Sequence, residues 1–181
     1  GCTVTERFSV IKLNSLFDEE WEFVGPTPNV SVDGAAMSVQ ETSDEEGYIV
    51  AGAINSQPSS SSNFYVARID KSGLILWDYQ STDGGFATSV METQDGGFIA
   101  AGARADNVDD MKVIRFRDTG PIMWIKHYGG TTGDQVANSI IQTIDGGFVL
   151  AGYSTNSDGT GDVSQPSGEE DCWVLRINEF G

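Results

Sequence analysis

The stretch "TQDGGFIAAG", residues 93–102, decides the fold because it occurs again about fifty residues later as "TIDGGFVLAG", residues 143–152. An earlier version, "TSDEEGYIVAG" at residues 42–52, is one residue longer in the middle. Three copies of one phrase at a spacing of about 50 residues predict a chain built from one repeated structural unit.

Four segments recur around this phrase. The first lies at 35–42, 86–93 and 136–143, and the second is the "GGF" run itself. The third places a basic residue between apolar ones, at 7–14, 64–70, 111–117 and 172–178. The fourth ends on a tryptophan, at 17–21, 73–77 and 120–124. All four have the alternation or the β-branched and aromatic content of strands.

Glycine-containing connections join these segments. "DGG" follows the first segment, and "DKSG" and "RDTG" separate the third from the fourth. Such residues tolerate a positive φ, so they predict tight hairpin turns between antiparallel strands.

A four-stranded antiparallel unit of about 50 residues is typical of a β-propeller blade. The sequence therefore predicts an all-β fold of the β-propeller type, a single domain over residues 1–181 with about three and a quarter repeats. We expect a half blade at 7–24, blades at 35–79 and 86–128, and an incomplete blade at 135–178. A β-sandwich is the alternative all-β fold.

The expected strands do not close a ring of complete blades. Three interpretations stay open: a fragment of a longer propeller, a small and imperfectly closed propeller, or a subunit whose open edges pair with other copies, which would complete the ring or extend it. The chain does not begin with Met, which indicates a processed or excised chain.

The pattern W…YGG…A.SI.QT.DGGF.LAG…WVLRI, residues 124–181, resembles the repeats of bacterial secreted and cell-surface β-propeller proteins. The likeness extends over nearly the whole chain. It implies an extracellular or cell-surface location and a scaffold without a catalytic signature of its own.

The formal net charge of −17 repels nucleic acid and anionic lipid, so neither is expected as a partner. No apolar run approaches the length of a membrane span, and we expect no membrane insertion. No cofactor is expected apart from calcium, for which the acidic loop at 157–171 offers the ligands Asp158, Asp162, Glu169 and Asp171, although a solvated loop explains the same residues.

One basic residue recurs in each third segment, and one tryptophan in each fourth segment. The basic residues are Lys12, Arg68, Arg115 and Arg176, and the tryptophans are Trp21, Trp77 and Trp124. We expect each cation to pack between blades and to pair with an acid, with Asp44, Asp95 and Asp145 as candidates. A ring of cations that grips an anion, and a sugar-stacking role for the tryptophans, are the functional alternatives.

Five further residues have weaker signals. Cys2 and Cys172 could form a disulfide within one chain or between two chains, or stay reduced. Asn29 lies in a glycosylation sequon. His127 is the single histidine and has no recognisable catalytic partners. Trp173 aligns with Tyr65 and Lys112, and this position is expected to face outward or toward a partner.

The sequence therefore predicts a non-catalytic extracellular structural or adhesive repeat protein that binds copies of itself and could assemble head to tail into a filament. The alternative is a carbohydrate- or protein-binding propeller domain of a larger secreted protein. A propeller glycosidase or lyase is the third and weakest hypothesis.

Overall fold

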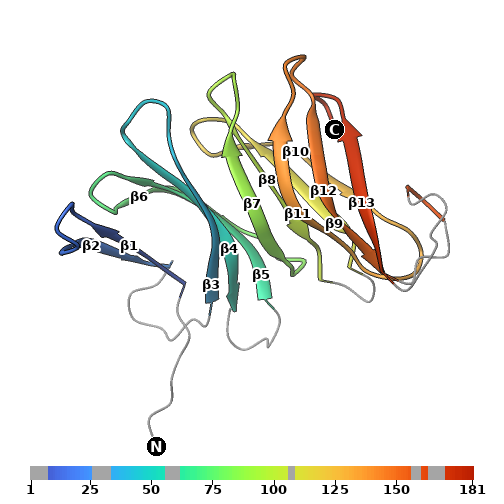
Figure 1. Ribbon diagram of the computed structural model, residues 1–181, viewed down its shortest axis with the longest axis horizontal. Coiled ribbons are helices and arrows are strands. Elements are labelled where there is room, and N and C mark those ends of the chain that lie inside the picture. The colour runs from blue at the N-terminus through green and yellow to red at the C-terminus, as the bar shows by residue number, and fades with distance from the viewer. Residues whose placement is uncertain (1–7, 26–33, 56–61, 106–108, 156–159, 163–169) are drawn as a thin grey trace, which may run out of the picture.

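A computed structural model describes residues 8–25, 34–55, 62–105, 109–155, 160–162 and 170–181. The described chain is all β, with four antiparallel sheets that follow one another in chain order from left to right in Figure 1. Each sheet pairs strands that are consecutive in the sequence, so every connection within a sheet is a hairpin.

The first sheet has two strands, β1 (Ser9–Leu13) and β2 (Glu19–Val24). The second has β3 (Gly34–Glu41), β4 (Gly47–Asn55), β5 (Ser62–Asp70) and β6 (Ile75–Gln80). The third has β7 (Phe86–Glu92), β8 (Phe98–Ala103), β9 (Met111–Phe116) and β10 (Ile122–Tyr128). The fourth has β11 (Gln135–Gln142), β12 (Phe148–Thr155) and β13 (Glu170–Ile177), with no fourth strand among the described residues.

The strands of the fourth segments extend past the tryptophans that mark them. β2, β6 and β10 end at Val24, Gln80 and Tyr128, within one residue of the expected ends at 24, 79 and 128. In the second sheet, β5 offers backbone partners as far as Tyr65, which pairs with Gln80. Pairing with the neighbouring strand, rather than the local apolar pattern, therefore sets where this strand ends.

The turn between the first two strands of a unit needs a positive φ, as its glycines indicated. Gly96 and Gly146 adopt φ values of 81° and 86°. In the longer first unit, Glu45 takes this conformation at 58°. A non-glycine residue rarely adopts a positive φ, and here a bond from the Glu45 amide to the Thr42 carbonyl, at 3.0 Å, holds it in the turn.

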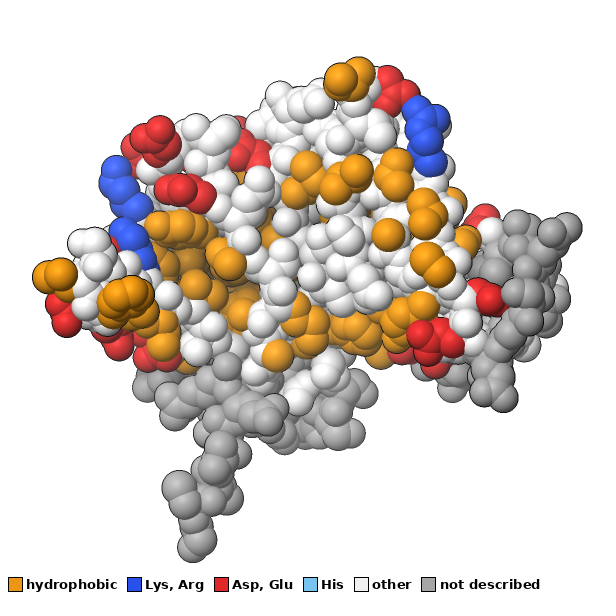
Figure 2. All heavy atoms as spheres, viewed as in Figure 1, with side chains coloured by type: hydrophobic (Ala, Val, Ile, Leu, Met, Phe, Trp, Pro, Cys, Tyr) orange, Lys and Arg blue, Asp and Glu red, His pale blue; other side chains and the backbone are white. Residues whose placement is uncertain are grey.

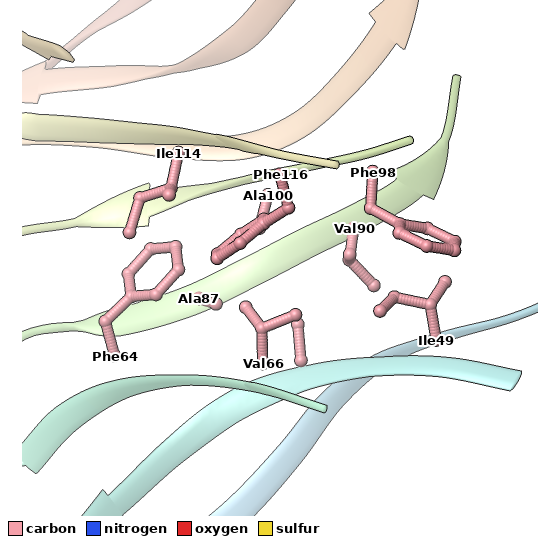
Figure 3. Packing of buried hydrophobic residues seen from close by; sticks show 10 residues of the cluster. Ile49, Phe64, Val66, Ala87, Val90, Phe98, Ala100, Ile114 and Phe116 are labelled. Carbon is pink, nitrogen blue, oxygen red and sulfur yellow. The ribbon is translucent and has the colours of Figure 1, made fainter. Parts of the chain in front are cut away.

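The core lies between successive sheets rather than inside any one of them. Figure 3 shows the cluster between the second and third sheets, in which Phe64 and Val66 meet Ile114 and Phe116. Similar clusters lie between the first and second sheets and between the third and fourth. Each sheet is thus a layer that is stabilised by apolar contact with its neighbours in the chain.

We call the side of a sheet that packs on the following sheet its forward face, and the opposite side its rear face. In the second sheet the forward face carries Ile49, Ala51, Phe64, Val66 and Arg68. The third sheet carries Ile99, Ala101, Met111, Val113 and Arg115 in the same strand register. The repeated sequence pattern therefore builds the same packing surface twice.

Candidate functional site

Each repeated arginine forms a cluster with a threonine and an aspartate in the turn before the second strand. Arg68 pairs with Asp44, and Arg176 pairs with Asp145. Arg115 contacts Asp95 Oδ1 at 2.5 Å and also donates a hydrogen bond to Thr93 Oγ1. These are the acidic partners that the sequence indicated.

The threonine of each cluster fixes the aspartate in place. Thr42, Thr93 and Thr143 donate from Oγ1 to Oδ1 of the aspartate two residues later, at 2.6, 2.7 and 2.5 Å. The turn phrase "TxD" therefore encodes a counter-ion for an arginine that follows 20 to 31 residues later.

The aspartates are held as carboxylates. The hydrogen bond from Thr42 is the main cause of a lowered pKa of Asp44, and Thr143 has the same effect on the pKa of Asp145. Burial by itself raises the pKa of Asp95, but hydrogen bonds from Thr93 and Arg115 outweigh this effect and bring the pKa to about 2.

Two of the arginines also contact the next sheet. The guanidinium carbon of Arg68 lies 5.4 Å from the centroid of the Phe98 ring, and that of Arg115 lies 5.7 Å from Phe148. Both phenylalanines follow the "DGG" turn of the next unit. Each arginine thus joins a turn of its own sheet to an aromatic ring of the following sheet.

Lys12 differs from the arginines with which it aligns. Its sheet has only two described strands and no "TxD" turn, so Lys12 pairs with Glu20 at 2.8 Å. A hydrogen bond with Glu20 is the main cause of its raised pKa. All four cations have acidic partners, which supports their structural role over an anion-binding ring.

The tryptophans of the fourth segments also connect neighbouring sheets. The indole N–H of Trp21 donates to the Lys71 carbonyl at 2.8 Å, and that of Trp77 donates to the Asp118 carbonyl at 2.9 Å. Trp124 donates to the Glu179 carbonyl at 3.2 Å. In every case the acceptor is the residue directly after the third segment of the next unit.

The first strands of the units lie next to one another and exchange hydrogen bonds. Ser38 Oγ accepts from the Val90 amide at 3.2 Å, and Ser89 Oγ accepts from the Ile140 amide at 3.3 Å. Thr88 Oγ1 donates to the Ala137 carbonyl at 2.5 Å. Strands β3, β7 and β11 therefore run side by side through the middle of the molecule (Figure 1).

An ion pair between a buried lysine and a partly exposed aspartate was missed by the sequence analysis. The position of Tyr65, Lys112 and Trp173 was expected to face outward or toward a partner, but Tyr65 and Lys112 are fully buried within the chain and Trp173 is half-buried. Lys112 Nζ contacts Asp83 Oδ1 at 2.5 Å, and burial lowers the pKa of Lys112. The rear faces of the second, third and fourth sheets are covered by the preceding sheet, which strand alternation alone cannot reveal.

His127 lies beside this pair, with Nε2 at 3.9 Å from Asp83 Oδ2. Burial and the nearby charges of Arg104 and Lys112 lower the pKa of His127. The imidazole is therefore largely neutral at pH 7.

The other candidate sites are only partly described. Cys172 is an exposed free thiol, whereas Cys2 lies outside the described residues, as does Asn29. Among the proposed calcium ligands, Asp162 and Asp171 are described and Asp158 and Glu169 are not. Within the described part of the chain, no group of three or more His, Cys, Asp or Glu side chains could hold a metal ion.

The forward face of the fourth sheet is the most unusual surface. Strands β12 and β13 pair in the register of the buried sheets, so Val149 lies opposite Arg176 and Ala151 opposite Val174. The equivalent residues Val66 and Val113 are fully buried, whereas Val174 is 61% exposed. The Arg176 side chain is 64% exposed, against 15% for Arg68 and 5% for Arg115.

Comparison with known proteins adds the fold but no function. No family model and no curated protein matches the chain. A crystal structure of a protein of unknown function from Bacteroides caccae is similar, with a TM-score of 0.54 and 10% sequence identity. The match covers 96% of this chain and 58% of that protein. No helix long and apolar enough to cross a membrane is present in the described residues.

Proposed function

We propose that this chain is a non-catalytic, extracellular scaffold of the β-propeller type that binds further copies of itself end to end. The observation that carries the proposal is the exposed forward face of the β11–β13 sheet. It repeats, in the same register, a surface that is buried twice elsewhere in the chain. The free energy of the protein falls when another sheet covers an apolar surface of this kind.

The propeller arrangement is supported by the order of contacts. Each sheet packs on the next, the first strands of the units contact one another, and an arginine and a tryptophan reach forward from the second and the third sheets. Repetition of one contact set along the chain favours sheets arranged around a common axis. The extracellular or cell-surface location rests on the repeat motif and on the acidic composition.

The assembly is testable by mass. We expect the molar mass of the purified chain, measured by light scattering after gel filtration, to rise with concentration. Val174→Lys should shift the distribution toward monomer, because it places a charge on the exposed face. Leu74→Lys is the matched control, since Leu74 is 67% exposed on the turn before β6. A constant monomer mass from micromolar to millimolar concentration would contradict the proposal.

A binding module is the second candidate, and one hollow favours it. A cavity of about 420 Å³ lies where β3, β7 and β11 end, lined by polar groups that include Gln40, Ser43, Glu92 and Gln142. All four of these groups already have partners within the chain. Ser43 donates to the Glu92 carboxylate, Gln40 accepts from the Glu92 amide, and Gln142 accepts from the Gln94 amide. A glycan array tests this candidate, with Glu92→Ala as the variant that should lose any signal.

Figure 2 shows a further exposed apolar area in the hollow between the β1–β2 sheet and β3. On β3, Met37 is 48% exposed and Val39 is 56% exposed. Val90 and Ile140, which align with Val39, are buried. The first sheet has no described counterpart of the first two strands of a unit, which would cover this area. Both ends of the stack of sheets therefore carry open apolar surface.

A further inference from the structure

The rear face of the β1–β2 sheet carries exposed apolar side chains that have buried counterparts elsewhere. Ile11 is 52% exposed and Leu13 is 48% exposed. The aligned residues of β9, Ile114 and Phe116, are fully buried against the preceding sheet. The rear face of β1 thus has the composition of a covered surface, although no described sheet covers it.

Within the chain, forward-face valines meet these rear-face positions. Val66 of β5 lies in one buried cluster with Ile114 of β9. Val113 of β9 lies in the next cluster, against which Leu175 of β13 packs. The same alignment makes Val174 of β13 the partner expected for a residue at the position of Ile11.

Phe17 limits which sheet can precede the β1–β2 sheet. Its counterparts in the other turns are Gly73 and Gly120, on which the indole rings of Trp21 and Trp77 rest. A Cβ atom at either glycine would lie 2.9 Å from the ring, which is closer than carbon atoms pack. Phe17 adopts the same left-handed backbone, with φ of 66°, but carries a whole aromatic side chain that is 82% exposed.

A sheet with a tryptophan-bearing fourth strand therefore cannot precede the β1–β2 sheet in the usual way, because its indole ring would occupy the place of the Phe17 side chain. Among the described sheets, only the β11–β13 sheet has a forward face without such a strand. That face is also the exposed one. Among the described sheets, these two exposed faces are therefore both apolar, and the β11–β13 face leaves the space that Phe17 requires.

We propose that the forward face of the β11–β13 sheet of one copy packs on the rear face of the β1–β2 sheet of a second copy, with Val174 against Ile11. This interface rests on the self-association proposed above and defines its geometry. It joins two different surfaces, so it extends from copy to copy and gives a filament, or a ring if the rotation closes.

Charge sets the conditions for this contact. Each chain carries a formal net charge of −17, so two copies repel at low ionic strength. The proposed interface is mainly apolar. Added salt therefore screens the repulsion between the two copies without weakening the apolar contact. Association through this interface should therefore strengthen as sodium chloride is raised from 20 to 500 mM, a range chosen to span about 20 to 4 Å in screening length.

The test is disulfide trapping between two single-cysteine proteins. Both are made in the full chain with Cys2→Ser and Cys172→Ser, one carrying Val174→Cys and the other Ile11→Cys. Mild oxidation of the mixture should give a covalent heterodimer in non-reducing electrophoresis, and neither protein alone should give comparable dimer. Leu74→Cys mixed with Val174→Cys is the control and should crosslink at least tenfold less.

Each outcome decides one question. Dimers of Val174→Cys with itself would show that two forward faces meet, and would overturn the proposed geometry. Concentration-dependent mass without any Val174–Ile11 crosslink would also overturn it, while the proposed self-association would stand. A chain that remains monomeric at all salt concentrations overturns both, which would leave the faces to be covered by other parts of a longer protein.

Discussion

The contact between each tryptophan and the following turn can be tested with a matched pair of glycine substitutions. Gly73 and Gly146 have nearly the same backbone φ, 85° and 86°. A Cβ atom at Gly146 meets nothing within 4 Å, whereas one at Gly73 lies 2.9 Å from Cε3 and 3.0 Å from Cδ2 of Trp21. The pair therefore separates backbone strain from the clash with the indole ring.

Alanine in the left-handed region costs about 1 to 2 kcal/mol, and this cost applies to both variants. Gly73→Ala must also push the indole away from the turn. That movement weakens the bond from Trp21 to the Lys71 carbonyl, worth about 1 kcal/mol. It also disturbs the contact of Trp21 with Tyr48, at a ring separation of 5.9 Å, for which aromatic pairs contribute about 0.5 to 1.5 kcal/mol.

We therefore expect Gly73→Ala to lower the free energy of unfolding by about 1 to 3 kcal/mol more than Gly146→Ala. The assay is equilibrium unfolding in urea, followed by tryptophan fluorescence, with the slope m checked for constancy. In a Trp21→Ala background the extra cost of Gly73→Ala should disappear. Equal costs for the two alanines in the natural background, within about 0.5 kcal/mol, would refute the packing that the structure shows.

Three further predictions concern the ion pairs and the inner strands. The lowered pKa of Asp95 stabilises the fold above pH 4, and this contribution should be lost as the pH falls toward 2. The pKa shift from 3.8 to about 2 corresponds to about 2 kcal/mol, which we reduce to roughly 1 kcal/mol because the carboxylate is 60% exposed. Asp95→Asn should abolish this part of the pH dependence in acid unfolding curves. Asp83→Asn leaves the Lys112 charge buried without its counter-ion and should lower the free energy of unfolding by about 2 to 4 kcal/mol at pH 7. Lys112→Met should leave the free energy of unfolding nearly unchanged. A larger loss of stability in Lys112→Met than in Asp83→Asn would contradict the role of Asp83 as the counter-ion of Lys112. Ser89→Ala removes the acceptor of the Ile140 amide and should cost about 1 kcal/mol, while Ser139→Ala on the exposed side of β11 should cost less than about 0.5 kcal/mol in the same urea assay.

The interior of each unit could be predicted because its information is local. The threonine, aspartate and glycine of "TxDGG" lie next to one another, so turn chemistry and the arginine's counter-ion follow from the phrase and the strand alternation. The all-β class and the order of the strands follow from the same repeat. The tryptophan-bearing strands end within one residue of the expected positions, and backbone pairing carries β6 as far as Gln80, opposite Tyr65.

The packing between units was not available from the sequence for a physical reason. Strand alternation assigns residues to two faces, but only the neighbouring sheet decides whether a face is covered. Lys112 is fully buried, and the similarly placed Val66 and Val174 differ from complete burial to 61% exposure. The sequence by itself determined the repeated unit, its turns and the ion pairs of its arginines. Only the tertiary structure decided which of the repeated faces remain exposed, because burial depends on contacts between segments that are about fifty residues apart.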